Sequence, residues 1–130
     1  MADATALDST VDIKNIVVRY LEAVATGPAA DIAALYAPDA TVEDPVGSEP
    51  HRGREAIAQF YSALEAAEID TTLLHLRVAE RNATFHFRVV TKTGDQTITI
   101  EPIDVMTFDP DGLITSMRAF WSPEDMLTGQ

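Results

Sequence analysis

The chain has 130 residues, of which 46% are hydrophobic and 23% charged, and this is the composition of one ordinary globular domain. Its formal net charge is −12 and its nine Lys and Arg residues are scattered, which disfavours binding to nucleic acid, anionic membranes or strongly anionic substrates. This net charge fits a neutral ligand best. The alternative is that the charge serves only solubility and says nothing about the ligand. The lack of cysteine excludes disulfides and thiolate chemistry.

The distribution of apolar residues predicts a soluble, cytoplasmic protein with no membrane association. No segment approaches the ~18 apolar residues that a membrane-spanning helix needs. The start of the chain, Met1-Ala2-Asp3-Ala4, lacks the basic and then apolar pattern of a signal peptide. We expect a single domain over residues 1–130, with residues 1–8 flexible because they are small and polar.

The first half of the chain predicts helices. Ser9 or Thr10 can cap the first helix and Gly27-Pro28 ends it. Its buried face is predicted by the spacing of Ile13, Ile16, Val17, Tyr20 and Val24. A short helix over 28–36, an extended piece over 41–43 and a turn over 44–47 follow. The next helix starts after Gly53, and its apolar stripe consists of Ile57, Phe60, Tyr61 and Leu64.

The second half predicts a β-sheet. Four β-rich runs cover approximately residues 70–79, 83–92, 96–108 and 113–122, and turn residues that suit hairpins separate them. Helices followed by such strands indicate an α+β fold. The predicted fold packs N-terminal helices on a curved antiparallel or mixed β-sheet, which forms a cone-shaped apolar pocket.

Alternation along the strands predicts which side chains face that pocket. One face of the second run carries Phe85, Phe87 and Val89, and the other carries His86, Arg88 and Val90. Met117, Ala119 and Trp121 share a face of the last run. In the third run, one face of the strand carries Ile98, Ile100, Asp104, Met106 and Phe108. A bulge at Pro102 would shift this register.

Asp104 is the one carboxyl group on that apolar row. A buried carboxyl without a partner tends to be protonated, and it can then donate a hydrogen bond to a developing oxyanion. The alternative is a carboxylate that is paired with an arginine or turned to an exposed edge.

Asp44 and the three tyrosines each have two interpretations. Asp44 precedes a proline, so it either caps a turn or acts as a general base at the mouth of an apolar pocket. Tyr20, Tyr36 and Tyr61 are either independent core residues or a hydrogen-bonded network that makes one hydroxyl a better donor.

Other chemistries lack the residues they need. His51, His75 and His86 have no metal-ligand spacing, and we expect His51 and His86 at the surface. The sequence contains no phosphate-binding glycine loop and no convincing serine–histidine pair for covalent catalysis.

Five segments, in this order, resemble bacterial ketosteroid isomerases: residues 19–20, 36–45, 53–55 together with 60–61, 103–106, and 117–122. The resemblance covers nearly the whole chain except residues 65–82, which could reshape one wall of the pocket. Val46 and Phe120 depart from residues common in that family.

The resemblance implies the cone-shaped α+β fold that is also found in nuclear transport factor two, scytalone dehydratase and polyketide cyclases. It further implies a homodimer packed through the sheet, a neutral steroid substrate, and no metal or organic cofactor. Ketosteroid isomerases are themselves a known example of two aspartates tuned apart by their surroundings, one ionised and one neutral.

Matched by position, Asp44 corresponds to the family's base, which moves a proton from C4 to C6 of a Δ5-3-ketosteroid. Tyr20 and Asp104 correspond to the oxyanion donors, and Tyr36 and Tyr61 to the tyrosines behind Tyr20. The residues expected to contact the steroid are Val24, Phe60, Phe87, Val89, Met117 and Trp121.

Two other functions stay open at this point. One is another enzyme of the same fold, such as a dehydratase, a polyketide cyclase or an epoxide hydrolase, the last of which needs an Asp–Arg–Asp set in the pocket. The other is a non-catalytic carrier of steroids or other lipophiles, which would not need Asp44.

Overall fold

The structure is a computed structural model that describes the backbone of residues 2–129 and the side chains of residues 12–129. Its three helices are α1 (Ala2–Thr26), α2 (Ala29–Ala33) and α3 (Gly53–Ser62). Its strands are β1 (Tyr36–Glu43), β2 (His51–Arg52), β3 (Glu68–Ala79), β4 (Asn82–Thr93), β5 (Gln96–Ile100), β6 (Ile103–Phe108), β7 (Ile114–Phe120) and β8 (Leu127–Gly129). A short 3₁₀ helix, η1 (Pro123–Asp125), precedes β8.

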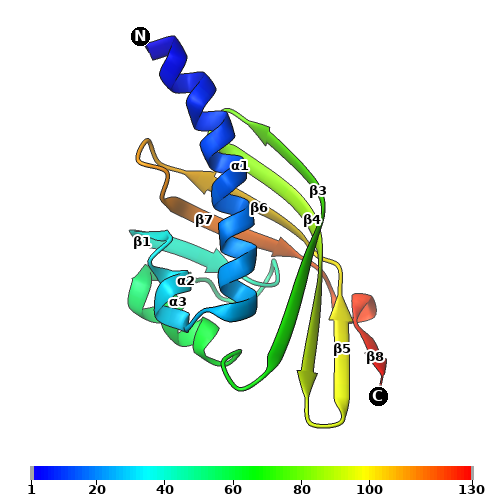
Figure 1. The fold of residues 1–130 in the computed structure, drawn as a ribbon. Helices are drawn as coiled ribbons and strands as arrows, with labels where there is room; N and C mark the ends of the chain where they lie inside the picture. Colours follow the sequence, from blue (N-terminus) through cyan, green and yellow to red (C-terminus); the bar gives the residue numbers. More distant parts are fainter. Residues whose placement is uncertain (1, 130) are drawn as a thin grey trace.

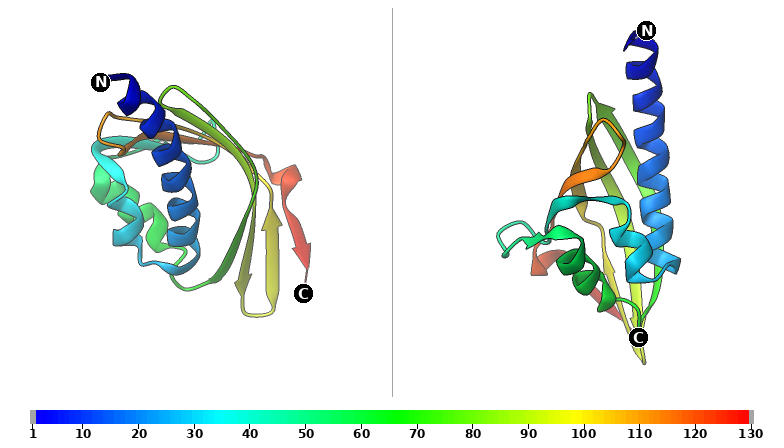
Figure 2. Two further views of the ribbon diagram at one scale, coloured as in Figure 1. Left: turned by 45° about the horizontal axis from the view of Figure 1, so that its top comes forward. Right: turned by 90° about the vertical axis from the view of Figure 1, so that its left-hand side faces the viewer.

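The strands form one mixed sheet in the order β2-β1-β7-β6-β4-β5-β8, and β3 pairs with β4 on its other side. All neighbours are antiparallel except β1 and β7, which are parallel. The sheet curves around α1, and the three helices lie on its concave side (Figure 1). Strands β5 and β8 extend away from the helices (Figure 2). The predicted α+β arrangement of helices on a curved mixed sheet is confirmed.

The core lies between the helices and the concave face of the sheet. Its fully buried members include Val17 on α1, Val42 on β1, Ile57 on α3 and Met106 on β6. The alternation predicted for β4 is observed, since Phe85 and Phe87 are buried whereas Arg88 is exposed. The apolar stripes of α1 and α3 therefore face the sheet, as their spacing predicts.

Several elements differ from the predictions. Helix α1 begins at Ala2 and not at a cap at Ser9 or Thr10, since the alanines before that point favour helix. Residues 1–8 were expected to be flexible. Met1 and the side chains of residues 2–11 lie outside the described part of the chain. Strand β1 begins at Tyr36, and the short strands β2 and β8 were not predicted because they carry too few residues to show alternation.

The predicted run 96–108 is divided at Glu101-Pro102 into β5 and β6. Proline has no N–H to donate to a sheet, and the Pro102 carbonyl instead accepts a bond from the Phe87 N–H at 3.2 Å. Strand β4 consequently pairs with β6 through residues 82–86 and with β5 through residues 89–93. No helix in the described part of the chain combines the length and apolar character needed to cross a membrane.

Candidate active site

A mostly apolar cavity of about 170 Å³ opens between α1, α3 and the concave face of the sheet. Its lining consists of Tyr20, Val24, Asp44, Phe60, Tyr61, Leu64, Phe87, Val89, Thr91, Ile100, Pro102, Asp104, Ala119 and Trp121. Larger hollows at the surface, such as one of about 250 Å³ between α1 and the 109–112 turn, do not contain this combination of apolar walls and a few convergent polar groups.

Three tyrosines from different elements form a hydrogen-bonded chain beside the cavity. The hydroxyl oxygens of Tyr20 and Tyr61 lie 2.7 Å apart, and those of Tyr61 and Tyr36 lie 2.8 Å apart. All three side chains are buried. If Tyr36 donates to Tyr61 and Tyr61 donates to Tyr20, the proton of Tyr20 is left for a ligand, and the chain polarises it.

Burial keeps these tyrosines protonated. It raises the pKa of Tyr20 well above its ordinary value, and the nearby Tyr36 and Asp104 raise it further, against a lowering by the hydrogen bond from Tyr61. A buried phenolate would lose its hydration, so Tyr20 is a hydrogen-bond donor at neutral pH.

Asp104 lies on β6 between apolar neighbours and is 1% exposed. Its partners across the sheet are Phe85 on β4 and Ala119 on β7. Its Oδ1 atom is buried and has no hydrogen-bond partner among the described residues. Burial, and secondly the charge of Asp44, raise the pKa of Asp104 well above its ordinary value. Both effects favour the protonated form of the carboxyl group, whose O–H can be donated to a ligand in the cavity.

Asp44 follows the end of β1 and also lines the cavity. The Trp121 indole donates from Nε1 to Asp44 Oδ1 at 2.7 Å. Burial raises the pKa of Asp44, whereas the Trp121 hydrogen bond and the charge of His51 lower it. One cavity thus holds two carboxyl groups in different environments, because the Asp44 carboxylate accepts a hydrogen bond that the Asp104 carboxyl lacks.

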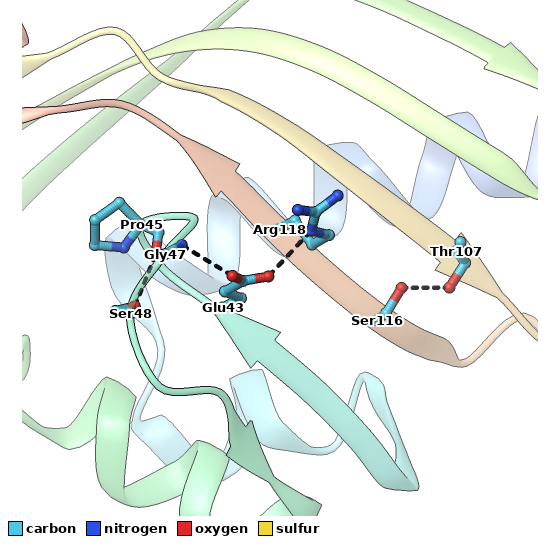
Figure 3. A network of polar contacts seen from close by, with 7 residues as sticks. All are labelled: Glu43, Pro45, Gly47, Ser48, Thr107, Ser116 and Arg118. Atoms are coloured by element: carbon cyan, nitrogen blue, oxygen red, sulfur yellow. Dashed lines mark hydrogen bonds and ion pairs between the residues drawn. The ribbon is translucent and has the colours of Figure 1, made fainter.

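The loop that follows Asp44 is attached to β7 by polar contacts (Figure 3). Glu43 accepts a hydrogen bond from the Gly47 N–H at 2.9 Å and forms an ion pair with Arg118 at 3.0 Å. The Val46 N–H donates to the Ala119 carbonyl at 2.8 Å. The hydrogen bond from the Gly47 N–H lowers the pKa of Glu43 most, and the contact with Arg118 lowers it further. Glu43 therefore stays ionised. These bonds hold both ends of the Asp44 segment against a rigid strand.

The structure brings most of the predicted site residues together around the cavity. Val24, Phe60, Phe87, Val89 and Trp121 line it with Tyr20, Asp44 and Asp104, and Tyr36 lies behind Tyr61. Met117, predicted to contact the ligand, is instead a core residue with 1% exposure. Ala119 lines the cavity in its place, two residues further along the same face of β7.

Several lining residues were not predicted, namely Leu64, Thr91, Ile100, Pro102 and Ala119. Thr91 could have been predicted, because it alternates with Phe87 and Val89 on the same face of β4. Leu64 could have been predicted from the apolar stripe that it shares with Phe60 and Tyr61. His51, expected in an exposed loop, is half-buried on β2, and its ring centroid lies 4.6 Å from that of Phe60. His86 lies on the outer face of the sheet, as expected, 3.6 Å from Glu101.

Comparison with known proteins identifies the relatives of this chain. Residues 17–117 match the SnoaL-like domain family. A steroid Delta-isomerase from Nocardioides simplex is 59% identical over 118 residues, which cover 91% of this chain and 96% of that protein. The predicted resemblance to steroid isomerases is thereby confirmed.

A solved structure has the same fold. It belongs to SalBIII, an epoxide hydrolase/cyclase-like enzyme with a role in pyran ring formation in the polyether salinomycin. The TM-score is 0.82 and the identity 28%, over 88% of this chain and 93% of that one. The chain belongs to the SnoaL-like domain family.

Proposed function

We propose that this protein is a steroid Delta-isomerase that converts a Δ5-3-ketosteroid to its Δ4 isomer by intramolecular proton transfer. The observation that supports this most directly is the pair of carboxyl groups in one apolar cavity. Asp104 has a buried oxygen without a partner, beside Tyr20, whereas Asp44 accepts a hydrogen bond from Trp121. The close similarity to a steroid Delta-isomerase over most of the chain agrees with it.

In the proposed reaction, the Asp44 carboxylate removes a proton from C4 of the substrate. The electron pair of that C–H bond moves into the ring system, and the 3-keto oxygen gains negative charge as a dienolate forms. The O–H groups of Tyr20 and Asp104 donate to this oxygen as an oxyanion hole, with no reorganisation of solvent. Asp44 then returns the same proton to C6, so the C=C bond has moved and nothing is consumed.

The surroundings of each group suit its proposed role. The apolar walls hold a flat hydrocarbon skeleton and exclude water, which strengthens the hydrogen bonds to the dienolate oxygen. Tyr20 takes up part of the negative charge of the dienolate oxygen, and the hydrogen bonds from the tyrosines behind it stabilise that charge. Every proposed step uses only side chains of this chain.

An epoxide hydrolase or cyclase is less well supported, even though SalBIII shares the fold. Such chemistry would need an arginine between two carboxylates, and no arginine among the described residues lines the cavity. Arg88, the nearest in sequence to the lining residues of β4, lies on the other face and pairs with Glu101 at 2.8 Å.

We also propose a single cytoplasmic domain over residues 1–130 that forms a homodimer through the outer face of the sheet. The support is an apolar pair on that face: Ile103 and Phe120 are register partners on β6 and β7 and are 46% and 43% exposed. Large apolar side chains that are adjacent and exposed favour an interface. The active-site cavity lies on the opposite face and stays open in such a dimer.

The test of the proposed function is the isomerisation of 5-androstene-3,17-dione by the purified protein, followed as the ultraviolet absorbance of the conjugated enone. We expect rapid conversion without added metal or cofactor. A folded protein that binds the steroid but does not convert it would instead be a carrier, and the proposed function would be wrong.

Removal of the Trp121 indole is expected to shift the pH profile. The hydrogen bond from Trp121 lowers the pKa of Asp44, so Trp121→Phe raises that pKa. Because the base must be ionised, the acid limb of kcat/KM then moves to higher pH. Rates measured across the pH range check this, and an acid limb that stays in place or moves to lower pH would contradict it.

Removal of the Glu43 carboxylate is expected to slow the reaction through the position of the Asp44 loop. Glu43→Gln weakens the contacts with Arg118 and Gly47, so kcat falls, by less than the ~100-fold that a 1 Å displacement of a reacting group can cost. The matched control is Glu101→Gln, which weakens the exposed ion pair with Arg88 and leaves the Asp44 loop unchanged. Equal kcat values for the two variants would show that the Glu43 contacts do not position the base.

A further inference from the structure

Thr91 is the one hydrogen-bonding side chain of the cavity lining that the proposed mechanism does not use. The other lining residues with polar groups are Tyr20, Asp44, Tyr61, Asp104 and Trp121, and all of them act in or around the two proton-transfer steps. The half-buried hydroxyl can bond water when the cavity is empty, and a ligand that fills the cavity must replace that bond.

The position of Thr91 is set by the alternation of β4. Phe85, Phe87, Val89 and Thr91 occupy successive positions on the concave face of that strand. Phe85 is the register partner of Asp104, and its ring centroid lies 6.3 Å from that of Tyr20. Thr91 is six residues further along and is the register partner of Ile98 on β5, close to the end of β4. It therefore lies at the end of the cavity opposite the two oxyanion donors.

The Thr91 hydroxyl is available to a ligand. Thr91 is half-buried at the cavity wall, and its hydroxyl donates to no described residue. Thr71 on β3, the register partner of Val89, behaves differently and donates to the Leu21 carbonyl at 3.0 Å. A threonine satisfied like Thr71 would be a structural residue, whereas Thr91 lines the cavity without such a bond.

We propose that Thr91 is a specificity residue that hydrogen-bonds an oxygen substituent on the far ring of the substrate, a keto or hydroxyl group at C17. This proposal rests on the proposed function. A rigid steroid whose 3-keto oxygen lies against Tyr20 and Asp104 extends its D ring along β4, past Phe87 and Val89. Its C17 substituent then comes to the Thr91 end of the cavity. The hydroxyl can donate to a ketone or accept from an alcohol, so both oxidation states would be bound.

The test compares two substrates that differ only in that oxygen, 5-androstene-3,17-dione and 5-androsten-3-one, with the wild type and with Thr91→Val. We expect the variant to lose about 3- to 10-fold in kcat/KM on the dione, the effect of one hydrogen bond, and to be unchanged on the 17-deoxy steroid. The contact is made equally in the ground state and the transition state, so the loss falls on KM and not on kcat.

Two further variants separate a specificity role from a structural one. Thr91→Ser keeps the hydroxyl and is expected to retain the preference for the dione. Thr84→Val, at an exposed position on the outer face of β4, is expected to leave kcat/KM unchanged on both substrates. A Thr91→Val variant that loses activity equally on both substrates, or on neither, would overturn the proposal.

Failure of the proposed function would be recognised separately. If the wild type isomerises neither steroid, the isomerase assignment is wrong, and equilibrium binding of the two steroids then tests Thr91 by itself. A weaker affinity of Thr91→Val for the dione alone would still support the contact, and equal affinities of variant and wild type for the dione would overturn it.

Discussion

Replacement of Asp44 by asparagine is expected to lower kcat by about 10²- to 10⁴-fold, which is the usual contribution of a positioned general base. Asparagine keeps the size of the side chain and can still accept the Trp121 hydrogen bond, but its amide cannot take a proton from carbon. Steroid affinity should change little, since the walls of the cavity are untouched. Enone formation and equilibrium binding, measured side by side, check both parts of this expectation.

The same substitution should also change Asp104. The charge of Asp44 contributes to the raised pKa of Asp104, second to burial, so its removal lowers that pKa. Asp104 nevertheless stays buried, and burial, the larger cause, still favours its protonated form. We therefore expect Asp44→Asn to remove the proposed base and to leave the proposed oxyanion donor in place. An Asp44→Asn protein that binds the steroid and turns over at nearly the wild-type rate would show that another group is the base.

Much of this site could be predicted from the sequence because the two relevant periodicities are strong. The helix stripes placed Tyr20 and Tyr61 on buried faces, and both are core residues in the structure. Strand parity placed Asp104 on an apolar row, and it is the one buried acidic side chain among those described. An aspartate that breaks an apolar row is informative because folding would otherwise exclude it.

The remaining features depend on contacts between distant segments. The pairing of β1 with β7 brings Asp44 next to Trp121, which is 77 residues further along the chain. Pro102 divides one predicted strand into β5 and β6, and the register of each against β4 follows from that division. Met117 was misplaced for a related reason: parity identifies the inner face of β7 but not which of its residues the cavity reaches.

Replacement of Asp104 by leucine is expected to lower kcat by about 10²- to 10³-fold, the usual cost of losing one oxyanion donor. Asparagine at the same position should lose less, since its amide N–H₂ can still donate to the dienolate oxygen. The order wild type, Asp104→Asn, Asp104→Leu in kcat would thus follow donor ability. An Asp104→Leu variant with wild-type kcat would exclude Asp104 from the oxyanion hole.

Stability gives a second, independent test of the state of Asp104. Its pKa is raised in the folded protein, so folding favours the protonated form. The stability that the neutral group contributes is complete below its unfolded pKa of about 3.9 and is lost as the pH rises towards its folded pKa. Asp104→Asn has no such titration, so the variant should gain stability relative to the wild type as the pH rises from about 4 to 8. Urea unfolding of both proteins across this range measures the difference. A difference that does not vary with pH would mean that Asp104 is ionised in the folded protein with nearly its ordinary pKa, and an ionised carboxylate cannot donate to the dienolate oxygen.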